Sequence, residues 1–171
     1  MRMSNDTRDG LMVGLIAFGA VAAFYSLFDL LASRGPFYTV TLLGLAVFQG
    51  LRDPSVLTNP VIPDPHAIER YNALHLALSL VIGVVVVHFA GAAERDPARR
   101  MPMLALIVGG FIVTIALVSW LSAPLRSALP VWTIVVANSA AVAVAALWLA
   151  RARPGIVARI LHGATTTRPA D

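Results

Sequence analysis

The chain has 171 residues, of which 58% are apolar and only 13% are charged. Soluble globular domains are about 45–50% apolar and about 25% charged, so this composition excludes a soluble domain. A mean hydropathy of +0.78 also excludes a disordered chain, because disorder requires low hydrophobicity. The composition therefore predicts an integral membrane protein.

The charged residues and the missing cysteines narrow the classes of partner and chemistry further. All thirteen basic residues are Arg, the net charge is +4, and there is no Cys. Without Cys, the chain has no disulfides, no thiolate metal sites, no iron–sulfur ligands and no Cys nucleophile. No soluble domain is present to carry a basic face, so we expect no nucleic-acid partner and interpret the Arg residues as topology signals.

Four apolar segments are long enough to cross a bilayer, which needs roughly 20 apolar residues in a helix. They run over residues 10–32, 67–92, 101–122 and 129–150. A fifth apolar run, residues 36–51, reaches only about 24 Å as a helix and is short for a span. We predict an all-α integral membrane fold of four transmembrane helices in an antiparallel bundle, with a short re-entrant or interfacial helix at 36–51.

The Arg residues favour four spans over five and indicate the orientation. With both termini cytoplasmic, four spans place nine Arg residues inside and four outside, whereas five spans give at best eight against five. The nine inner residues are Arg2, Arg8, Arg95, Arg99, Arg100, Arg151, Arg153, Arg159 and Arg168, and the four outer ones are Arg34, Arg52, Arg70 and Arg126.

The segments between and after the spans are short. Residues 52–65 contain four prolines and predict an extended outer loop, in which Asp64-Pro65 supplies an N-cap and a first-turn proline for the second span. Residues 156–162 are an interfacial helix or the fraying end of the fourth span. We assign 1–163 to a single transmembrane domain and 164–171 to a disordered tail.

Small residues at four-residue spacing predict where the spans pack, because helices in lipid associate through close contact of their backbones. Gly109, Gly110 and Ala116 lie on the third span and could admit a neighbour there. The pattern fits a compact bundle or a bundle that docks onto another membrane subunit. The packing positions that we predict on spans one and four are Gly10, Gly14, Gly19, Ala23, Ala137, Ala141 and Ala145.

Polar residues inside the spans are candidate functional residues, because they are costly in hydrocarbon. Asp29 lies near the outer end of span one, and His75 lies about ten residues into the second span. Two interpretations are open. In the first, Asp29 pairs with Arg70 or His75, locks the spans together and holds the short segment in place; in the second, the cluster is a proton or substrate path. The full cluster is Asp29, Arg70, Tyr71, Asn72, His75 and Ser79.

The histidines restrict haem and metal binding. His88 follows His75 by thirteen residues, about 20 Å along the helix and about 220° around it, so the two cannot ligate one metal. Spans one, three and four contain no His, so an intrachain bis-His haem is excluded, and a single tetrapyrrole ligand from His75 or His88 remains an alternative. No catalytic triad, phosphate loop or metal motif occurs, and we expect no enzyme activity, no metal and no cofactor.

Two stretches of the chain resemble a known group of proteins. These stretches are Gly35-Pro36-Phe37-Tyr38-Thr39, with Leu42-Leu43-Gly44 and Val47-Phe48 after it, and Tyr71-Asn72-Ala73-Leu74-His75. They resemble a group of small uncharacterised four-helix membrane proteins of bacteria with GC-rich genomes, over about residues 10–92. The resemblance implies a bacterial inner-membrane location and carries no activity. It also marks Tyr38, Thr39, Tyr71 and His75 as parts of one outer-leaflet arrangement.

We expect a non-enzymatic polytopic membrane protein that acts as an accessory or structural subunit. Its expected partners are the lipid bilayer and other membrane protein subunits of a larger complex. One alternative is a small transporter or proton-conducting protein that uses Asp29 and His75. A further alternative is a pigment- or haem-associated subunit that supplies one His ligand.

Overall fold

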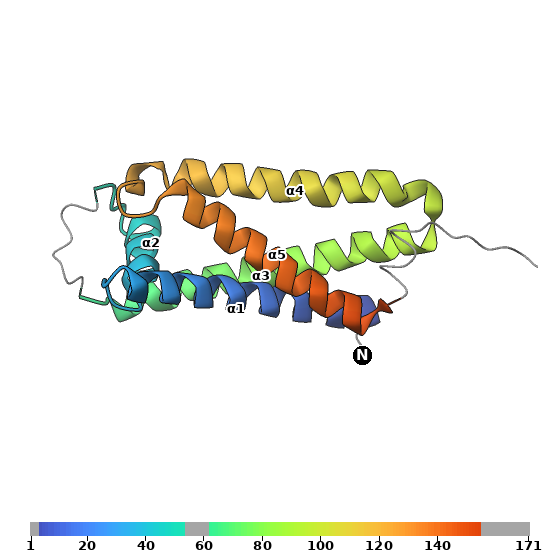
Figure 1. Ribbon diagram of the computed structural model, residues 1–171, viewed down its shortest axis with the longest axis horizontal. Coiled ribbons are helices and arrows are strands. Elements are labelled where there is room, and N and C mark those ends of the chain that lie inside the picture. The colour runs from blue at the N-terminus through green and yellow to red at the C-terminus, as the bar shows by residue number, and fades with distance from the viewer. Residues whose placement is uncertain (1–3, 54–61, 155–171) are drawn as a thin grey trace, which may run out of the picture.

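The computed structural model describes residues 4–53 and 62–154. Every regular element in these ranges is a helix, and the predicted all-α fold is confirmed (Figure 1). Most of the predicted loop 52–65, the residues 155–163 and the tail 164–171 lie outside the described residues. The helices are α1 (Asn5–Leu31), α2 (Tyr38–Phe48), α3 (Pro65–Arg95), η2 (Pro97–Arg99), α4 (Arg100–Leu121), η3 (Ala123–Leu125) and α5 (Val131–Ala152).

Four of these helices are long and apolar enough to cross a membrane. They are α1, α3, α4 and α5, with 27, 31, 22 and 22 residues. Even 22 residues rise about 33 Å, which matches a hydrocarbon core of about 30 Å. α2 has 11 residues and rises only about 16 Å, so it is too short to span, as predicted.

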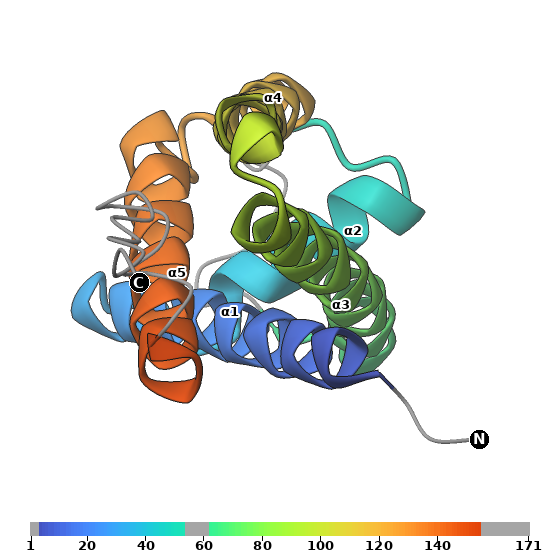
Figure 2. The ribbon, with the colours of Figure 1, turned by 90° about the vertical axis from the view of Figure 1, so that its right-hand side faces the viewer.

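The helices form an uneven bundle. α1 and α3 lie side by side, α5 crosses α1 obliquely, and α4 stands apart from α1 (Figures 1 and 2). α2 lies across one end, where α1 and α4 finish and α3 and α5 begin. We call this the α2 end. The opposite end, which we call the terminal end, holds the beginning of α1 and the end of α5.

Glycines form the contact between α1 and α3. A Cβ on Gly10 would meet the backbone of Val84, and a Cβ on Gly14 would meet the backbone carbonyl of Ser79. From the other side, a Cβ on Gly83 would meet the backbone of both α1 glycines. The two backbones therefore touch, as the spacing of Gly10 and Gly14 predicts.

The other predicted packing residues divide into two groups. Ala137, Ala141 and Ala145 on α5 are buried, in agreement with the prediction. Gly19 and Ala23 are both exposed, and no described atom lies within 4 Å of a Cβ built on Gly19. The prediction of a contact face at these two positions is wrong within this chain, because a helix that is apolar all round does not reveal which stripe turns inward.

α4 contributes least to the interior. None of its 22 residues is buried, and Gly109 and Gly110 have nothing within 4 Å of an added Cβ among the described residues. Within this chain these glycines therefore admit no neighbour. α4 is held mainly at its two ends, where short connections join it to α3 and α5 (Figure 1).

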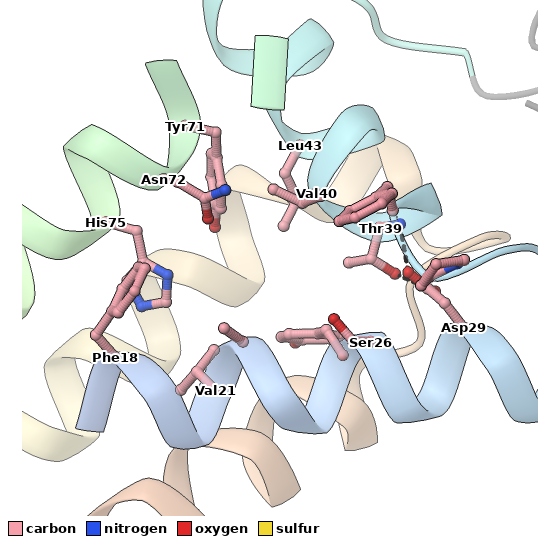
Figure 3. A pocket seen from close by; sticks show the side chains of 14 residues that line it. Phe18, Val21, Ser26, Asp29, Thr39, Val40, Leu43, Tyr71, Asn72 and His75 are labelled. Carbon is pink, nitrogen blue, oxygen red and sulfur yellow. Dashed lines mark hydrogen bonds between the residues drawn. The ribbon is translucent and has the colours of Figure 1, made fainter. Parts of the chain in front are cut away.

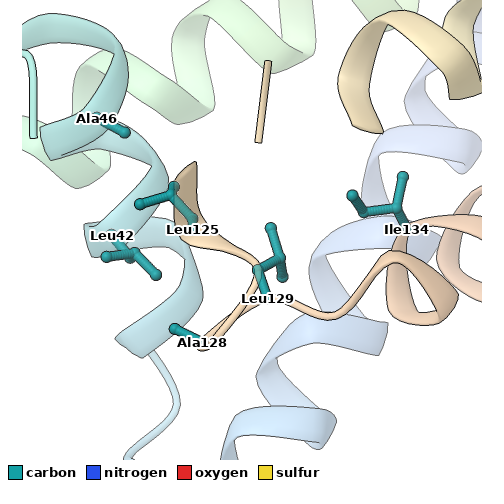
Figure 4. Packing of buried hydrophobic residues seen from close by; sticks show 6 residues of the cluster. All are labelled: Leu42, Ala46, Leu125, Ala128, Leu129 and Ile134. Carbon is teal, nitrogen blue, oxygen red and sulfur yellow. The ribbon is translucent and has the colours of Figure 1, made fainter. Parts of the chain in front are cut away.

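At the α2 end, an apolar cluster fixes α2 against the connection between α4 and α5. Leu42 and Ala46 come from α2, while the α4–α5 connection and the start of α5 supply the rest (Figure 4). Leu42 is 0% exposed and Leu125 is 1% exposed, so α2 is packed into the bundle rather than resting on its surface. The full cluster is Leu42, Ala46, Leu125, Ala128, Leu129 and Ile134.

The turn between α1 and α2 also requires an unusual backbone. Ser33 has a φ of 55° and Gly35 a φ of 84°, both in the left-handed region that glycine tolerates best. Between them, the Arg34 guanidinium donates to the carbonyl of Ala128 at 2.8 Å and lies 5.1 Å from the ring centre of Tyr38. These contacts set the direction in which α2 leaves α1.

At the terminal end, charged side chains join the first and last spans. Arg153 donates from Nε to Asp9 at 2.5 Å and from Nη1 to Asp6 at 2.6 Å. Arg95 at the end of α3 donates to the same Asp6 at 3.1 Å. Three helices therefore meet in one ion-pair cluster formed by Asp6, Asp9, Arg95 and Arg153.

Candidate functional site

A cavity of about 270 Å³ lies between α1, α2 and α3 near the α2 end (Figure 3). α1 supplies one wall, α3 the facing wall, and α2 closes the space at the end of the bundle. Polar and aromatic side chains line much of it. The lining residues are Phe18, Val21, Ala22, Tyr25, Ser26, Asp29, Pro36, Phe37, Thr39, Val40, Leu43, Tyr71, Asn72 and His75.

Asp29 lines this cavity but is paired within the protein. Its carboxylate accepts 2.7 Å and 2.6 Å hydrogen bonds from the backbone N–H and the hydroxyl of Thr39. Thr39 is the second residue of α2, and the N-cap residue Phe37 offers no side-chain hydrogen bond. Asp29 therefore caps α2 from a neighbouring helix, since a negative charge there satisfies a free N–H and opposes the helix dipole.

The predicted ion pairs of Asp29 are wrong. Arg70 is exposed and does not line the cavity, and the carboxylate of Asp29 is taken by Thr39 instead of Arg70 or His75. The backbone turn at Ser33 and Gly35 is the physical reason, because it brings the start of α2 back onto the last turns of α1. Asp29 nonetheless holds the short helix in place, as the first of the two interpretations expects.

Three of the predicted α3 residues do converge on the cavity. Tyr71, Asn72 and His75 lie within four residues of one another and line the same wall. The His75 ring lies 5.3 Å from the ring of Phe18 on α1, edge to face, and 6.0 Å from the ring of Tyr71. Ser79 does not line the cavity, and its backbone instead contacts Gly14, so its assignment to the cluster is wrong.

Several polar groups around the cavity have no hydrogen-bond partner in the protein. Within residues 4–53 and 62–154, no protein group bonds the hydroxyl of Ser26, the amide of Asn72 or the imidazole of His75. These side chains come from facing walls and point toward the partly open cavity (Figure 3). All three side chains are half-buried and have no protein hydrogen bond, so their donors and acceptors are available to a bound molecule.

A tetrapyrrole does not fit inside this cavity. Pockets for drug-sized ligands measure about 300–1,000 Å³, and a tetrapyrrole is at least of that size. The 270 Å³ cavity is smaller, and Phe18 and Tyr71 already flank the His75 ring. His88 lies toward the terminal end of α3, is exposed, and faces the ring of Phe89 at 6.5 Å. A single His ligand to a tetrapyrrole outside the chain stays a prediction.

Asp64, at the α2 end but outside the spans, caps α3 as predicted. Its carboxylate accepts from the backbone N–H groups of His66 at 2.9 Å and Ala67 at 3.1 Å, and from the amide of Gln49 at 3.2 Å. The hydrogen bond from the Ala67 N–H contributes most to lowering the pKa of Asp64. The described part of the chain contains no group of three His, Cys, Asp or Glu placed to hold a metal ion.

Comparisons with known protein families, with curated proteins and with solved structures found no match to this chain.

Sequence reasoning found Asp29 on the α1 wall but missed Ser26 and the apolar residues of the α1 and α2 walls. Ser26 lies three residues before Asp29, so both project from the same side of α1, and this spacing was the available signal. Thr39 was marked only by the resemblance, and its hydrogen bond to Asp29 was not predicted because it depends on the turn between the two helices. The α3 wall was found because three polar residues stand close together in an otherwise apolar segment.

Proposed function

We propose that the chain is a non-enzymatic multi-pass membrane protein that binds a small uncharged molecule in the cavity between α1, α2 and α3. The observation that carries this proposal is the convergence of Ser26, Asn72 and His75 on one partly open cavity, where none of the three has a hydrogen-bond partner among the described residues. In a membrane interior, such groups gain most from a ligand that supplies the missing hydrogen bonds.

The charges of the site favour an uncharged ligand. Among the residues that the structure describes, no Arg lines the cavity, so an anion would lack a partner there. The one carboxylate, Asp29, is 1% exposed, and both of its oxygens accept hydrogen bonds from Thr39. A cation would therefore have to displace the cap of α2. For the same reason, the proposal assigns Asp29 a structural role and sets aside proton conduction between Asp29 and His75.

We further propose a bacterial inner-membrane location with both termini in the cytoplasm, which follows from the resemblance and the charge bias of the sequence. Under the positive-inside rule, the end richer in Arg faces the cytoplasm. The terminal end carries Arg8, Arg95, Arg99, Arg100, Arg151 and Arg153, whereas the α2 end carries Arg34, Arg52, Arg70 and Arg126. This orientation supports a cavity at the level of the outer leaflet.

Filling the cavity tests the proposed function. Ala22 lines the cavity, whereas its neighbour Ala23 is exposed, so Ala22→Phe and Ala23→Phe form a matched pair. A polar-lipid and small-molecule extract of bacterial membranes is added to the purified protein in detergent, and the thermal unfolding midpoint is measured. We expect the extract to stabilise the wild type and Ala23→Phe but not Ala22→Phe. Equal stabilisation of all three, or of none, would contradict the proposal.

A second candidate function, an accessory subunit of a larger membrane complex, is favoured by α4. This helix has no buried residue, and its adjacent Gly109 and Gly110 leave open backbone of the kind that membrane helices pack against. Purification in mild detergent should retain a stoichiometric membrane partner, and Gly109→Leu should release it. Ala143→Leu, on the exposed side of α5, is the control that should retain it. A partner-free wild-type particle would refute this function.

A further inference from the structure

We infer that the cavity binds the head group of a membrane quinone, which is a flat neutral ring with carbonyl oxygens and a lipid tail. This inference rests on the proposed function and specifies its ligand class. The hydrogen-bonding groups, the aromatic lining and the depth of the cavity each support it.

The polar groups match a ligand that accepts hydrogen bonds on opposite sides. Ser26 on α1 can donate from its hydroxyl, while Asn72 and His75 on the facing α3 wall can donate from N–H groups. A quinone carries two carbonyl oxygens at opposite edges of its ring, and each oxygen only accepts. Donors on the two facing walls can therefore each bond one carbonyl oxygen of a quinone. Because the ring is neutral, the cavity needs no counter-ion.

The remaining lining favours a flat ring. Phe18, Tyr25, Phe37 and Tyr71 surround the polar groups, and aromatic side chains pack well against the face or edge of another ring. A sugar or polyol of the same size would need a denser set of polar partners than the few unpaired side chains of this lining provide. The volume of about 270 Å³ suits a head group of one or two rings.

The depth of the cavity favours a ligand that arrives through the lipid. Its α1 wall runs from Phe18 to Asp29, within a helix that is long and apolar enough to span the membrane. At its rim, Pro36 is exposed and Phe37 is 49% exposed, so an apolar tail could pass this edge of α2. A lipid-borne ring reaches such a site laterally, without crossing the packed end of the bundle.

The test uses two bicyclic compounds with the same carbon skeleton, menadione and 2-methylnaphthalene, of which only menadione carries carbonyl oxygens. Binding to the full chain in lipid nanodiscs is measured by calorimetry. We expect saturable binding of menadione and at least tenfold weaker binding of methylnaphthalene, because the hydrocarbon leaves the polar groups unpaired. Equal affinity for the two compounds, or no saturable menadione binding, would overturn the inference.

Substitutions of the lining residues test whether menadione binds in the cavity. Asn72→Leu and His75→Phe each remove donors from the α3 wall, and Ser26→Ala removes the hydroxyl of the α1 wall with little change in shape. Each should weaken menadione binding about three- to tenfold, as expected for one lost hydrogen bond. His88→Phe makes the same exchange on the same helix outside the cavity and should bind as the wild type. Menadione binding that none of the three cavity variants weakens would contradict the inference.

The outcomes separate this inference from the proposed function. Stabilisation by the membrane extract that Ala22→Phe abolishes, together with no menadione binding, would leave the proposed function intact and refute a quinone ligand. No cavity-dependent effect of either the extract or menadione would refute both.

Discussion

At the terminal end of the bundle, Arg153 joins Asp6 and Asp9 through charged hydrogen bonds, and its side chain is 19% exposed. At the α2 end, Asp29 is 1% exposed, and it accepts from the backbone and hydroxyl of Thr39. Each group ties together helices that are distant in sequence or separated by a turn. The terminal end is held by ion pairs near the surface, whereas the α2 end is held by a single buried carboxylate that accepts from neutral donors.

The difference follows from access to water. Arg and Asp near the membrane surface keep part of their hydration, so an ion-pair cluster is tolerated there. A carboxylate deep in the bundle loses that hydration and needs close donors, which the free N–H and the dipole of α2 supply. The buried carboxylate at the α2 end is thereby satisfied, and the other residues that line the cavity beside it are uncharged.

The largest effect should come from the contact between α1 and α3, because these two helices connect the terminal end to the α2 end. In Gly83→Ala, the new Cβ would meet the backbone of Gly10 and Gly14, so α1 and α3 must separate. We expect a loss of about 3 kcal/mol in the free energy of unfolding, at the upper range for overpacking. SDS titration in mixed micelles measures it, and both ends should loosen together.

Gly19→Ala is the matched control for Gly83→Ala. An added Cβ at Gly19 meets nothing within 4 Å among the described residues, and Ala is the better helix former, so stability should stay equal or rise by up to about 1 kcal/mol. If Gly19→Ala destabilises the protein as much as Gly83→Ala does, the loss at Gly83 does not come from the close contact between α1 and α3.

The next largest effect should be confined to the α2 end. Asp29→Ala leaves the N–H and hydroxyl of Thr39 without their acceptor, and hydrogen bonds to a charged group contribute about 1.5–3 kcal/mol. We expect a loss of about 2–3 kcal/mol in the free energy of unfolding, by SDS titration, together with weaker ligand binding. Asp29→Asn keeps one acceptor oxygen and should lose less. The loss of stability in Asp29→Ala should change little with salt concentration, because interactions of a buried group are poorly screened.

A smaller, salt-dependent effect is expected at the terminal end. Arg153→Met removes the guanidinium that Asp6 and Asp9 share, at a partly exposed site. We expect a loss of about 1 kcal/mol at low ionic strength, discounted for screening, and less at high salt. Thermal unfolding at two salt concentrations measures it. A loss that is unchanged by salt would contradict the view that screened ion pairs hold the terminal end, in contrast to the buried carboxylate at the α2 end.

The sequence predicts the number and the limits of the spans well, because length and hydropathy are local properties. The four spans agree with α1, α3, α4 and α5 to within a few residues at most ends, and residues 36–51 contain a helix too short to cross. α1 begins earlier than expected, at Asn5, because Ser4 caps it and accepts from the Thr7 N–H. Likewise, Asp64 and Pro65 mark the start of α3 by local capping chemistry.

The partners of the polar residues could not be predicted, because they depend on how distant segments meet. Arg153 finds Asp9 across 144 residues, and no pattern in either segment indicates the pairing. Asp29 is expected to seek a cation, yet the backbone turn at Gly35 offers it the N-terminus of α2 first. The cavity likewise arises from three helices together, so its α3 wall and Asp29 were foreseen but the cavity itself was not.

The smallest effect should appear at Asp64, which shares the α2 end with Asp29 but is solvent-accessible and outside the spans. The hydrogen bond from the Ala67 N–H holds the pKa of Asp64 below its ordinary value of 3.8. Its stabilisation is therefore complete above about pH 4 and is lost as the pH falls through the lowered pKa of the folded state. Asp64→Asn, also a good N-cap, should match the wild type at pH 7 and vary less with acidification. Thermal unfolding of both proteins between pH 7 and pH 3 measures this, and parallel curves would show that Asp64 adds no pH-dependent stability to α3.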